Sequence, residues 1–299
     1  MKRGLLAAAA AIVALTYAGR LGLRARPSPF PTFGGRGREP ETVPLTPHLP
    51  PPVERFYRRL YGGRVPVLRS AVITGRARMR LAGITFPARF RFTHDAGRGY
   101  RHYIEATLFG LPLMKVNETY LGGRARLELP LGVTEGEPKV DQAANLALWA
   151  ESAFWLPAIL VTDERVRWEG VDESTALLVV PFGAGEERFV ACFDEATGML
   201  RLLEAERYKS HTSERKTLWR CEAREWTNVG GSTVPAVGAL TWADEGTPWA
   251  EFRAEDVAYN AEVLITSGPG NVVDEALPKK SKTPLDIERR LRRADNILG

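Results

Sequence analysis

The sequence predicts a mainly β (α+β) protein built on one large, curved antiparallel sheet. We expect a half-barrel of about 11 strands, covered by one or two helices. From about residue 65 onward, apolar and polar residues alternate with a period of two, which is typical of strands with one dry and one wet face. Helical spacing occurs in only two segments of the body, and helices do not alternate with strands, so a parallel sheet is not expected. A sheet this large must curl or split.

The clearest strands form a hairpin over residues 76–92. Ala77, Met79 and Leu81 alternate with arginines, and after the turn at 82–83 phenylalanines alternate with arginines again. Three more strands are predicted before the second helix, at 99–108, 112–121 and 124–129. After that helix, the pattern predicts strands at 165–170, 174–181, 187–194, 199–208, 215–226, 233–243 and 249–263.

The two predicted helices are 53–61 and 139–155. The first places Val53, Phe56 and Tyr57 on one face. The second carries Leu146 and Trp149 among other apolar residues at helical spacing, and a proline at 157 ends it. Helices packed on the concave face of a curled sheet would enclose a cavity of the kind that binds small ligands.

The segments outside the body predict contact with a membrane. Residues 1–26 begin with Lys2 and Arg3 and continue with the uncharged run 4–19, as in a signal peptide or a single N-terminal membrane anchor. Residues 27–52 contain nine prolines, which we expect to leave no room for helix or sheet and to form a spacer. The body spans 53–264, and 265–299 is predicted to be a linker and a basic C-terminal helix. We expect the body to be anchored on the extracytoplasmic side or exported.

Charge is distributed unevenly along the chain. The formal net charge is +5, yet residues 132–278 carry 26 acidic and 12 basic side chains. The strongest basic feature is the row of arginines on the wet face of the hairpin: Arg76, Arg78, Arg80, Arg89 and Arg91. They form either a solubilising face balanced by acidic strands or a binding surface for anionic lipid headgroups. Nucleic acid is not expected, because the neighbouring phenylalanines face the opposite side and cannot stack on bases.

Four short segments carry a family resemblance. They are residues 51–56, 149–158, 166–172 and 193–198, and their order and spacing matter more than any single residue. Over residues 52–264 the chain resembles a family of exported or membrane-associated bacterial proteins of unknown function, whose domain is similar to the lipoprotein-carrier fold of LolA and LppX. The resemblance implies a half-barrel with an apolar interior that can hold acyl chains. It implies no catalytic residues.

Large aromatic residues are the candidates for a ligand cavity. They come from the hairpin and from the second helix: Phe86, Phe90, Phe92, Trp149, Phe154 and Trp155. Aromatic side chains bury large areas in a filled core and in a cavity wall alike. The sequence therefore leaves open whether these residues surround a ligand or one another.

No pattern predicts catalysis, a metal or a cofactor. His94 and His102 flank a turn and could meet, with Glu105 beyond, but a metal site needs three or four converging ligands. Glu151 fits the solvated side of the second helix better than an acid in an apolar pocket, and Ser152 lacks the setting of a nucleophile. Cys192 and Cys221 are either a disulfide or two buried thiols.

The leading hypothesis is non-catalytic binding or carriage of a lipid or other hydrophobic ligand at the cell envelope. An apolar chain needs only a dry cavity, which explains the absence of a polar motif. The alternative is a structural or interaction protein of the envelope with a filled core. A hydrolase that uses Glu151 or the two histidines is less favoured; converging histidine and carboxylate groups around a cleft would support it.

Overall fold

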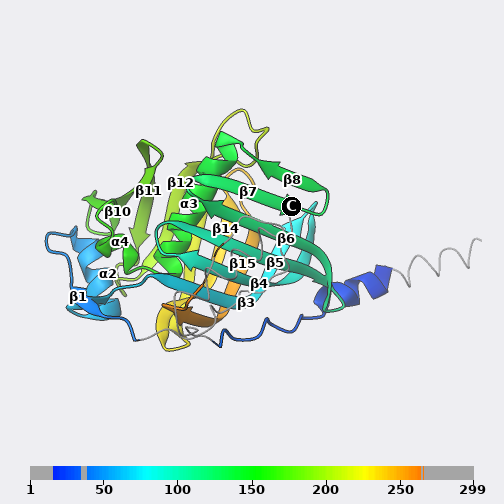
Figure 1. Ribbon diagram of the computed structural model, residues 1–299, viewed down its shortest axis with the longest axis horizontal. Coiled ribbons are helices and arrows are strands. Elements are labelled where there is room, and N and C mark those ends of the chain that lie inside the picture. Colours follow the sequence, from blue (N-terminus) through cyan, green and yellow to red (C-terminus); the bar gives the residue numbers. More distant parts are fainter. Residues whose placement is uncertain (1–15, 35–38, 264, 266–299) are drawn as a thin grey trace, which may run out of the picture.

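A computed structural model describes residues 16–34, 39–263 and 265 (Figure 1). Residues 16–24 are helical. Of the helices within the described ranges, none combines the length and the apolar character that crossing a bilayer requires. Most of the predicted signal peptide or anchor and the predicted C-terminal helix lie outside the described residues.

Thirteen strands form a single antiparallel sheet, in the order β8-β7-β6-β5-β4-β3-β15-β14-β13-β12-β11-β10-β9. The strands of the first half are β3 (Ser70–Leu81), β4 (Ile84–Asp95), β5 (Gly99–Leu108), β6 (Leu111–Leu121), β7 (Arg124–Leu129) and β8 (Gly132–Glu135). Those of the second half are β9 (Arg167–Gly170), β10 (Thr175–Phe182), β11 (Gly185–Phe193), β12 (Leu200–Arg207), β13 (Thr217–Val229), β14 (Ser232–Trp242) and β15 (Pro248–Tyr259). The predicted fold class is confirmed.

The sheet consists of two meanders joined through a single pair of strands. Within each half every strand pairs with its neighbour in sequence, and β3 pairs with β15 to connect the halves. The outer strands β8 and β9 do not pair with each other, so the sheet is curved but not closed into a barrel. The hydrogen bonds between β3 and β15 therefore hold the two halves of the sheet together.

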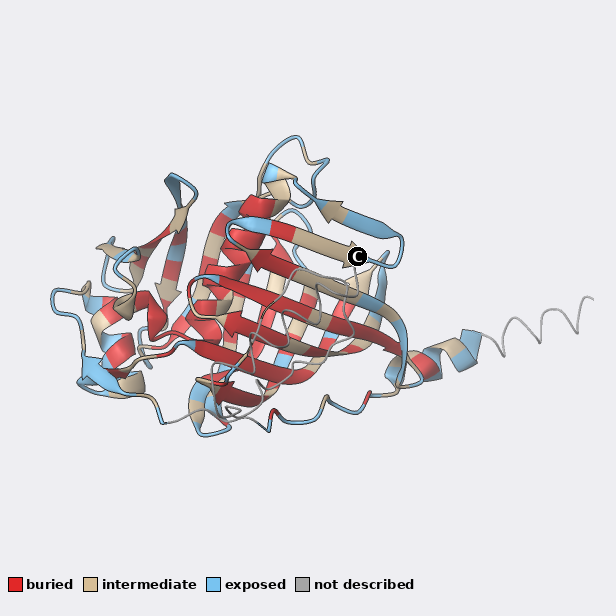
Figure 2. Ribbon diagram, viewed as in Figure 1, coloured by how far each residue is buried: buried red, intermediate tan, exposed pale blue. Residues whose placement is uncertain are grey.

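Helix α3 (Pro138–Trp155) lies against the concave face of the sheet (Figures 1 and 2). Its N-terminal end contacts both halves of the sheet, through Asp141 to β7 and Gln142 to β11. Fourteen of its residues are buried. A helix that is apolar on nearly all sides belongs in a core rather than at a surface. The short helix α4 (Ile159–Thr162) follows Pro157, whose carbonyl accepts a hydrogen bond of 2.8 Å from the Tyr57 hydroxyl.

Helix α2 (Pro51–Tyr61) closes one end of the sheet. Pro51 and Pro52 occupy its first turn, where a missing N–H costs nothing. Its buried face packs Phe56 against Phe193 of β11 and Trp226 of β13, with ring centroids 5.6 and 5.5 Å apart. One helix thus covers the concave face and a second flanks it.

The proline-rich segment differs from the expected spacer. The expectation that its prolines exclude sheet structure is wrong at β1 (Thr42–Pro44), which pairs with β2 (Arg64–Pro66) in a separate two-stranded ribbon. Prolines are tolerated there because each strand pairs on one side only. Further upstream, Phe33 is buried against Val72 and Ala258 on the face of the sheet opposite α3. The described part of this segment is therefore held against the body.

The two cysteines are free thiols. Strand β12 lies between them: Cys192 is opposite Leu202, whereas Cys221 is opposite the next residue, Leu203. They consequently point to opposite faces and are two strand spacings, or about 10 Å, apart. A disulfide needs Cα atoms within about 7 Å.

We expect unfolded, unreduced protein to react with two equivalents of a thiol reagent. The measurement is thiol titration in denaturant, with chemically reduced protein as the control. A protein that releases thiols only after reduction would contradict this arrangement.

Candidate functional site

A cavity of about 520 Å³ lies between α3 and the concave face of the sheet. Ligand pockets typically measure roughly 300–1,000 Å³. Most of its wall is apolar and comes from strands of both halves, including Met79, Leu81, Ile104, Val116, Leu127, Leu240 and Trp249. Helix α3 adds a row of small side chains: Ala143, Ala147 and Ala150. These alanines leave the space that larger side chains at the same positions would fill.

Three of the six predicted cavity residues line this cavity: Phe92, Phe154 and Trp155. Phe90 is fully buried beside it, with its ring 6.3 Å from that of Trp155 and 5.2 Å from that of Phe252. Phe86 is half-buried near the end of the hairpin, opposite Met79. That these residues contact a ligand remains a prediction.

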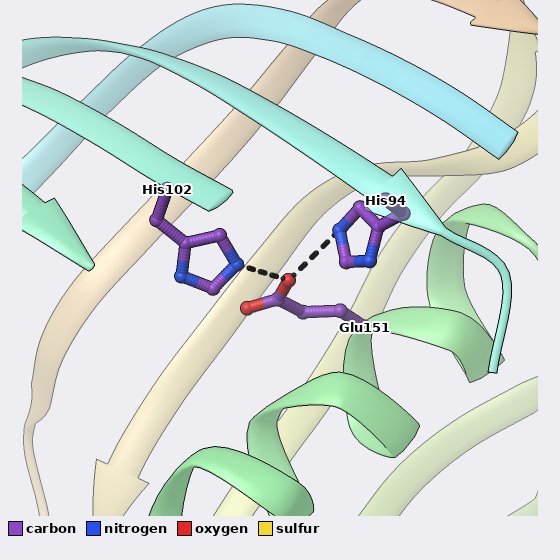
Figure 3. Close-up of side chains that lie close together, drawn as sticks. All are labelled: His94, His102 and Glu151. Carbon is purple, nitrogen blue, oxygen red and sulfur yellow. Dashed lines mark hydrogen bonds and ion pairs between the residues drawn. The ribbon is translucent and has the colours of Figure 1, made fainter. Parts of the chain in front are cut away.

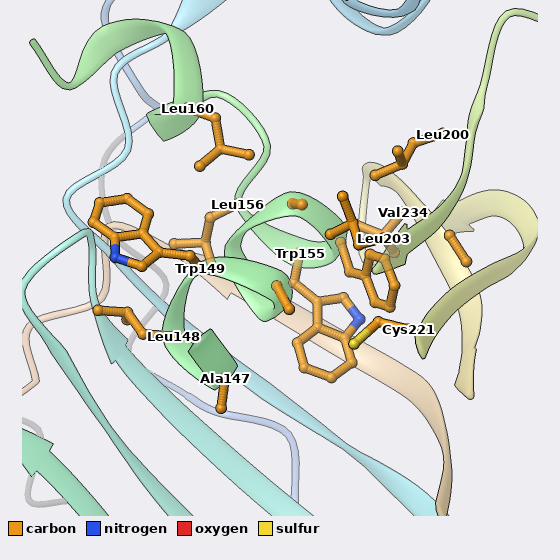
Figure 4. Packing of buried hydrophobic residues seen from close by; sticks show 14 of the residues in the cluster. Ala147, Leu148, Trp149, Trp155, Leu156, Leu160, Leu200, Leu203, Cys221 and Val234 are labelled. Atoms are coloured by element: carbon orange, nitrogen blue, oxygen red, sulfur yellow. The ribbon is translucent and has the colours of Figure 1, made fainter. Parts of the chain in front are cut away.

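Trp149 does not line the cavity, and Figure 4 shows it on a different side of α3 from Trp155. It is six residues before Trp155, which at about 100° per residue places the two indoles on different sides of the helix. Trp149 is buried against the β4–β5 turn, and the Arg165 guanidinium lies 5.9 Å from its ring centroid. Helical spacing alone does not separate the two positions, because α3 is buried on both sides.

The arginine row lies on the face of the sheet opposite α3, and three of its members form ion pairs. Arg76 contacts Glu255 at 2.6 Å, Arg80 contacts Glu245 at 2.8 Å, and Arg89 contacts Glu105 at 2.6 Å. Two of these carboxylates belong to the acidic second half of the chain.

The other two arginines have different surroundings. Arg78 is exposed and opposite Glu251 in the strand register. Arg91 donates a hydrogen bond of 3.1 Å to the carbonyl of Pro31. This charge compensation supports a solubilising face, and binding of lipid headgroups remains a prediction.

His102 and Glu151 line the cavity, and together with the buried His94 behind them they form a cluster (Figure 3). Nε2 of His102 lies 2.7 Å from Oε2 of Glu151, and Nε2 of His94 lies 3.1 Å from the same oxygen. The strand register explains how the two histidines meet. His94 is opposite Tyr100 and Phe92 is opposite His102, so both imidazoles are diagonal neighbours on the concave face.

Aromatic rings and a second carboxylate hold His102 in place. The Tyr100 ring stacks on the imidazole, with ring centroids 3.9 Å apart and an angle of 10° between the planes. The centroid of the Phe92 ring lies 4.0 Å from that of the imidazole. The Tyr100 hydroxyl donates a 2.6 Å hydrogen bond to Oε1 of Glu118. Oε2 of Glu118 lies 3.8 Å from Nδ1 of His102. The imidazole is therefore between two carboxylates.

These contacts set the protonation states of the cluster. Burial alone would lower the pKa of His102, but the carboxylates of Glu151 and Glu118 outweigh burial and raise that pKa to about 9. Burial would likewise raise the pKa of Glu151, but His102 and His94 outweigh it and lower the pKa to about 2. Burial lowers the pKa of His94, which is fully enclosed. The cluster thus contains a charged pair and a neutral imidazole.

One arrangement that the sequence left open does not occur, and one expectation is wrong. Glu105 does not join the histidines, because it points to the opposite face of β5 and pairs with Arg89. Glu151 is not on a solvated side of its helix, since α3 is enclosed and the Glu151 side chain is only 16% exposed. His94 follows Phe90 and Phe92 at intervals of two residues, so strand alternation alone does predict that it lies on the same dry face. No sequence signal joins Glu151 to it across 57 residues.

Fold and site together define a class of protein: an open, curved antiparallel sheet around one buried helix, with an apolar cavity between them. The chain belongs to a family of unknown function (DUF6544), whose sequence profile matches residues 40–254. This confirms the predicted resemblance to a family without an assigned function. No curated protein matches the chain.

Several solved structures are similar at low identity. The LolA superfamily protein NE2245 from Nitrosomonas europaea has a TM-score of 0.43 and 10% identity, covering 69% of this chain and 91% of its own. A putative outer membrane lipoprotein-sorting protein domain from Vibrio parahaemolyticus has a TM-score of 0.40 and 12% identity, covering 69% and 89%. A DUF1329 family protein from Desulfovibrio piger has a TM-score of 0.39 and 12% identity, covering 65% and 87%.

Proposed function

We propose that the protein binds or carries a lipid or another hydrophobic molecule in the cavity between α3 and the sheet, without catalysis. The observation that carries this proposal is the cavity itself, with its volume of about 520 Å³ and its mainly apolar wall. Each methylene that leaves water for such a wall contributes about 0.8 kcal/mol. An acyl chain could therefore be held without any specific polar contact.

The cavity favours this function over a filled interaction domain. Large side chains from both halves surround the space, and α3 presents three alanines to it beside Phe154 and Trp155. A hydrolase finds some support in the converging histidines and Glu151 beside the cavity. The nearby Ser152 does not supply its nucleophile, because that buried hydroxyl donates a 2.6 Å hydrogen bond to the carbonyl of Leu148 on its own helix.

The N-terminal sequence supports a place at the cell envelope. A basic start followed by the uncharged run 4–19 is typical of export or anchoring. We place the body on the extracytoplasmic side, with the N-terminus in contact with the membrane.

The test is native mass spectrometry of the full chain after removal of detergent, followed by organic extraction of retained molecules. We expect a hydrophobic molecule to co-purify, and the emptied protein to take up a fluorescent fatty acid. Cys221 lines the cavity and Cys192 faces the other side, so ligand should slow alkylation of Cys221 alone. An empty protein that takes up neither fatty acid nor phospholipid would overturn the proposal.

A further inference from the structure

The cluster of His94, His102 and Glu151 has the donor set of a metal site. Each residue offers one donor atom, and these atoms all lie within 4.8 Å of one another. Oε2 of Glu151 is 2.7 Å from one imidazole nitrogen and 3.1 Å from the other. Donors bound at about 2.0–2.1 Å around one tetrahedral ion are separated by roughly 3.3 Å. Small side-chain shifts, with release of the His102 proton to solvent, would therefore bring all three onto a common ion.

His94 provides an independent observation. Its side chain is 0% exposed, and within the described part of the chain Nδ1 has no partner, while Nε2 has only its 3.1 Å contact with Glu151, which lacks hydrogen-bonding geometry. A buried polar group without a partner costs about 1–3 kcal/mol. Nε2 faces Glu151 and the cluster (Figure 3). A cation between Nε2 and the Glu151 carboxylate would give both of them a well-aligned partner.

The surroundings of His102 match those of a metal-binding histidine. Such residues usually direct their second ring nitrogen toward a carboxylate, which orients the ring and strengthens it as a ligand. In His102 the Nδ1 atom lies 3.8 Å from Glu118, and Glu118 is itself held by the Tyr100 hydroxyl. Tyr100 and Phe92 restrict rotation of the ring.

We propose that His94, His102 and Glu151 bind one divalent transition-metal ion, with Zn²⁺ the best match and with a coordination position open to the cavity. Two imidazoles and a carboxylate suit Zn²⁺, whereas Ca²⁺ and Mg²⁺ prefer oxygen ligands. Three protein ligands leave a tetrahedral ion one position short. His102 and Glu151 both line the cavity, so the vacant position is accessible from it. This proposal does not rest on binding of a hydrophobic ligand.

The first experiment measures metal binding to the full chain after dialysis against a chelator. Titration with Zn²⁺ should show about one ion per chain and a rise in the melting temperature, because a ligand of the native state stabilises it. Co²⁺ should give the strong visible absorption of a tetrahedral nitrogen and oxygen site. A protein that binds neither Zn²⁺ nor Co²⁺ would overturn the proposal. An intense sulfur-to-cobalt band would place the ion at a cysteine thiolate and would also overturn the proposal.

Substitutions then locate the ion. His94→Gln and His102→Gln should weaken Zn²⁺ binding at least about a hundredfold, and Glu118→Gln should weaken it by roughly ten- to a hundredfold through the orientation of His102. His211→Gln is the matched control, because His211 also lines the cavity but stands outside the cluster. Circular dichroism checks that each variant is folded. Equal affinity in all four variants would contradict the assignment.

Discussion

Replacing Ala143 and Ala147 with phenylalanine should abolish most binding of a hydrophobic ligand while the fold is retained. Both alanines line the cavity and are one helical turn apart on α3. Two aromatic rings at these positions would occupy space that we assign to the ligand. If they displace about four methylenes, the loss is about 3 kcal/mol, or roughly a hundredfold in Kd. Titration with a fluorescent fatty acid measures the change.

A matched substitution separates blocking of the cavity from added surface hydrophobicity. Ala184→Phe makes the same change at the exposed turn between β10 and β11 and should leave affinity unchanged. The double variant should also retain Zn²⁺ binding, because it changes no member of the histidine cluster. Unaltered fatty-acid affinity in the folded double variant would exclude this cavity as the binding site.

Gly75→Ala should destabilise the protein more than any other single-methyl addition in the sheet. A Cβ atom at residue 75 would lie 2.0 Å from the carbonyl oxygen of Arg253, which is backbone and cannot rotate away. Gly75 is opposite Ala254, beside the bulge of β15, in the one pair of strands that joins the two meanders. The added methyl group must therefore separate β3 from β15.

We expect the free energy of unfolding to fall by about 3 kcal/mol or more, the upper range for overpacking a core. For a body of this size that corresponds to a drop of about 10 °C in Tm. Urea denaturation measures the difference, with Gly185→Ala as the control, because a Cβ atom there meets nothing closer than 3.8 Å. Equal stability of the two variants would show that the junction tolerates a side chain.

Much of the fold could be predicted because apolar and polar residues alternate along each strand and so show which side chains face inward. In β4 the period-two pattern places Phe90 and Phe92 on the concave face and Arg89 and Arg91 on the other. The same parity assigns His94. Helical spacing and Pro157 likewise located α3 within about a residue at each end. The short strands β1, β2 and β8 were missed because three or four residues carry too little periodicity.

The candidate site could be predicted only in part. Phe92, Phe154 and Trp155 line the cavity, but Trp149 belongs to the opposite side of a helix that is buried almost all round. Glu151 was assigned to solvent on the assumption that α3 has a wet face. Its actual partners, His94 and His102, lie on strands of the first half of the chain. Nothing in the sequence near any of these residues records that contact.

The sequence by itself determined the fold class, most strands with their inward faces, both principal helices and the family. These properties follow from backbone geometry, which repeats every two residues in a strand and every 3.6 in a helix. Only the tertiary structure decided that α3 packs on the concave face, that Arg76 meets Glu255, and that two histidines converge on Glu151 beside an open cavity. Those features depend on the pairing of β3 with β15 and on the volumes of side chains from distant segments. A cavity is the difference between the space that the backbone encloses and the volume that those side chains fill, and no local pattern encodes it.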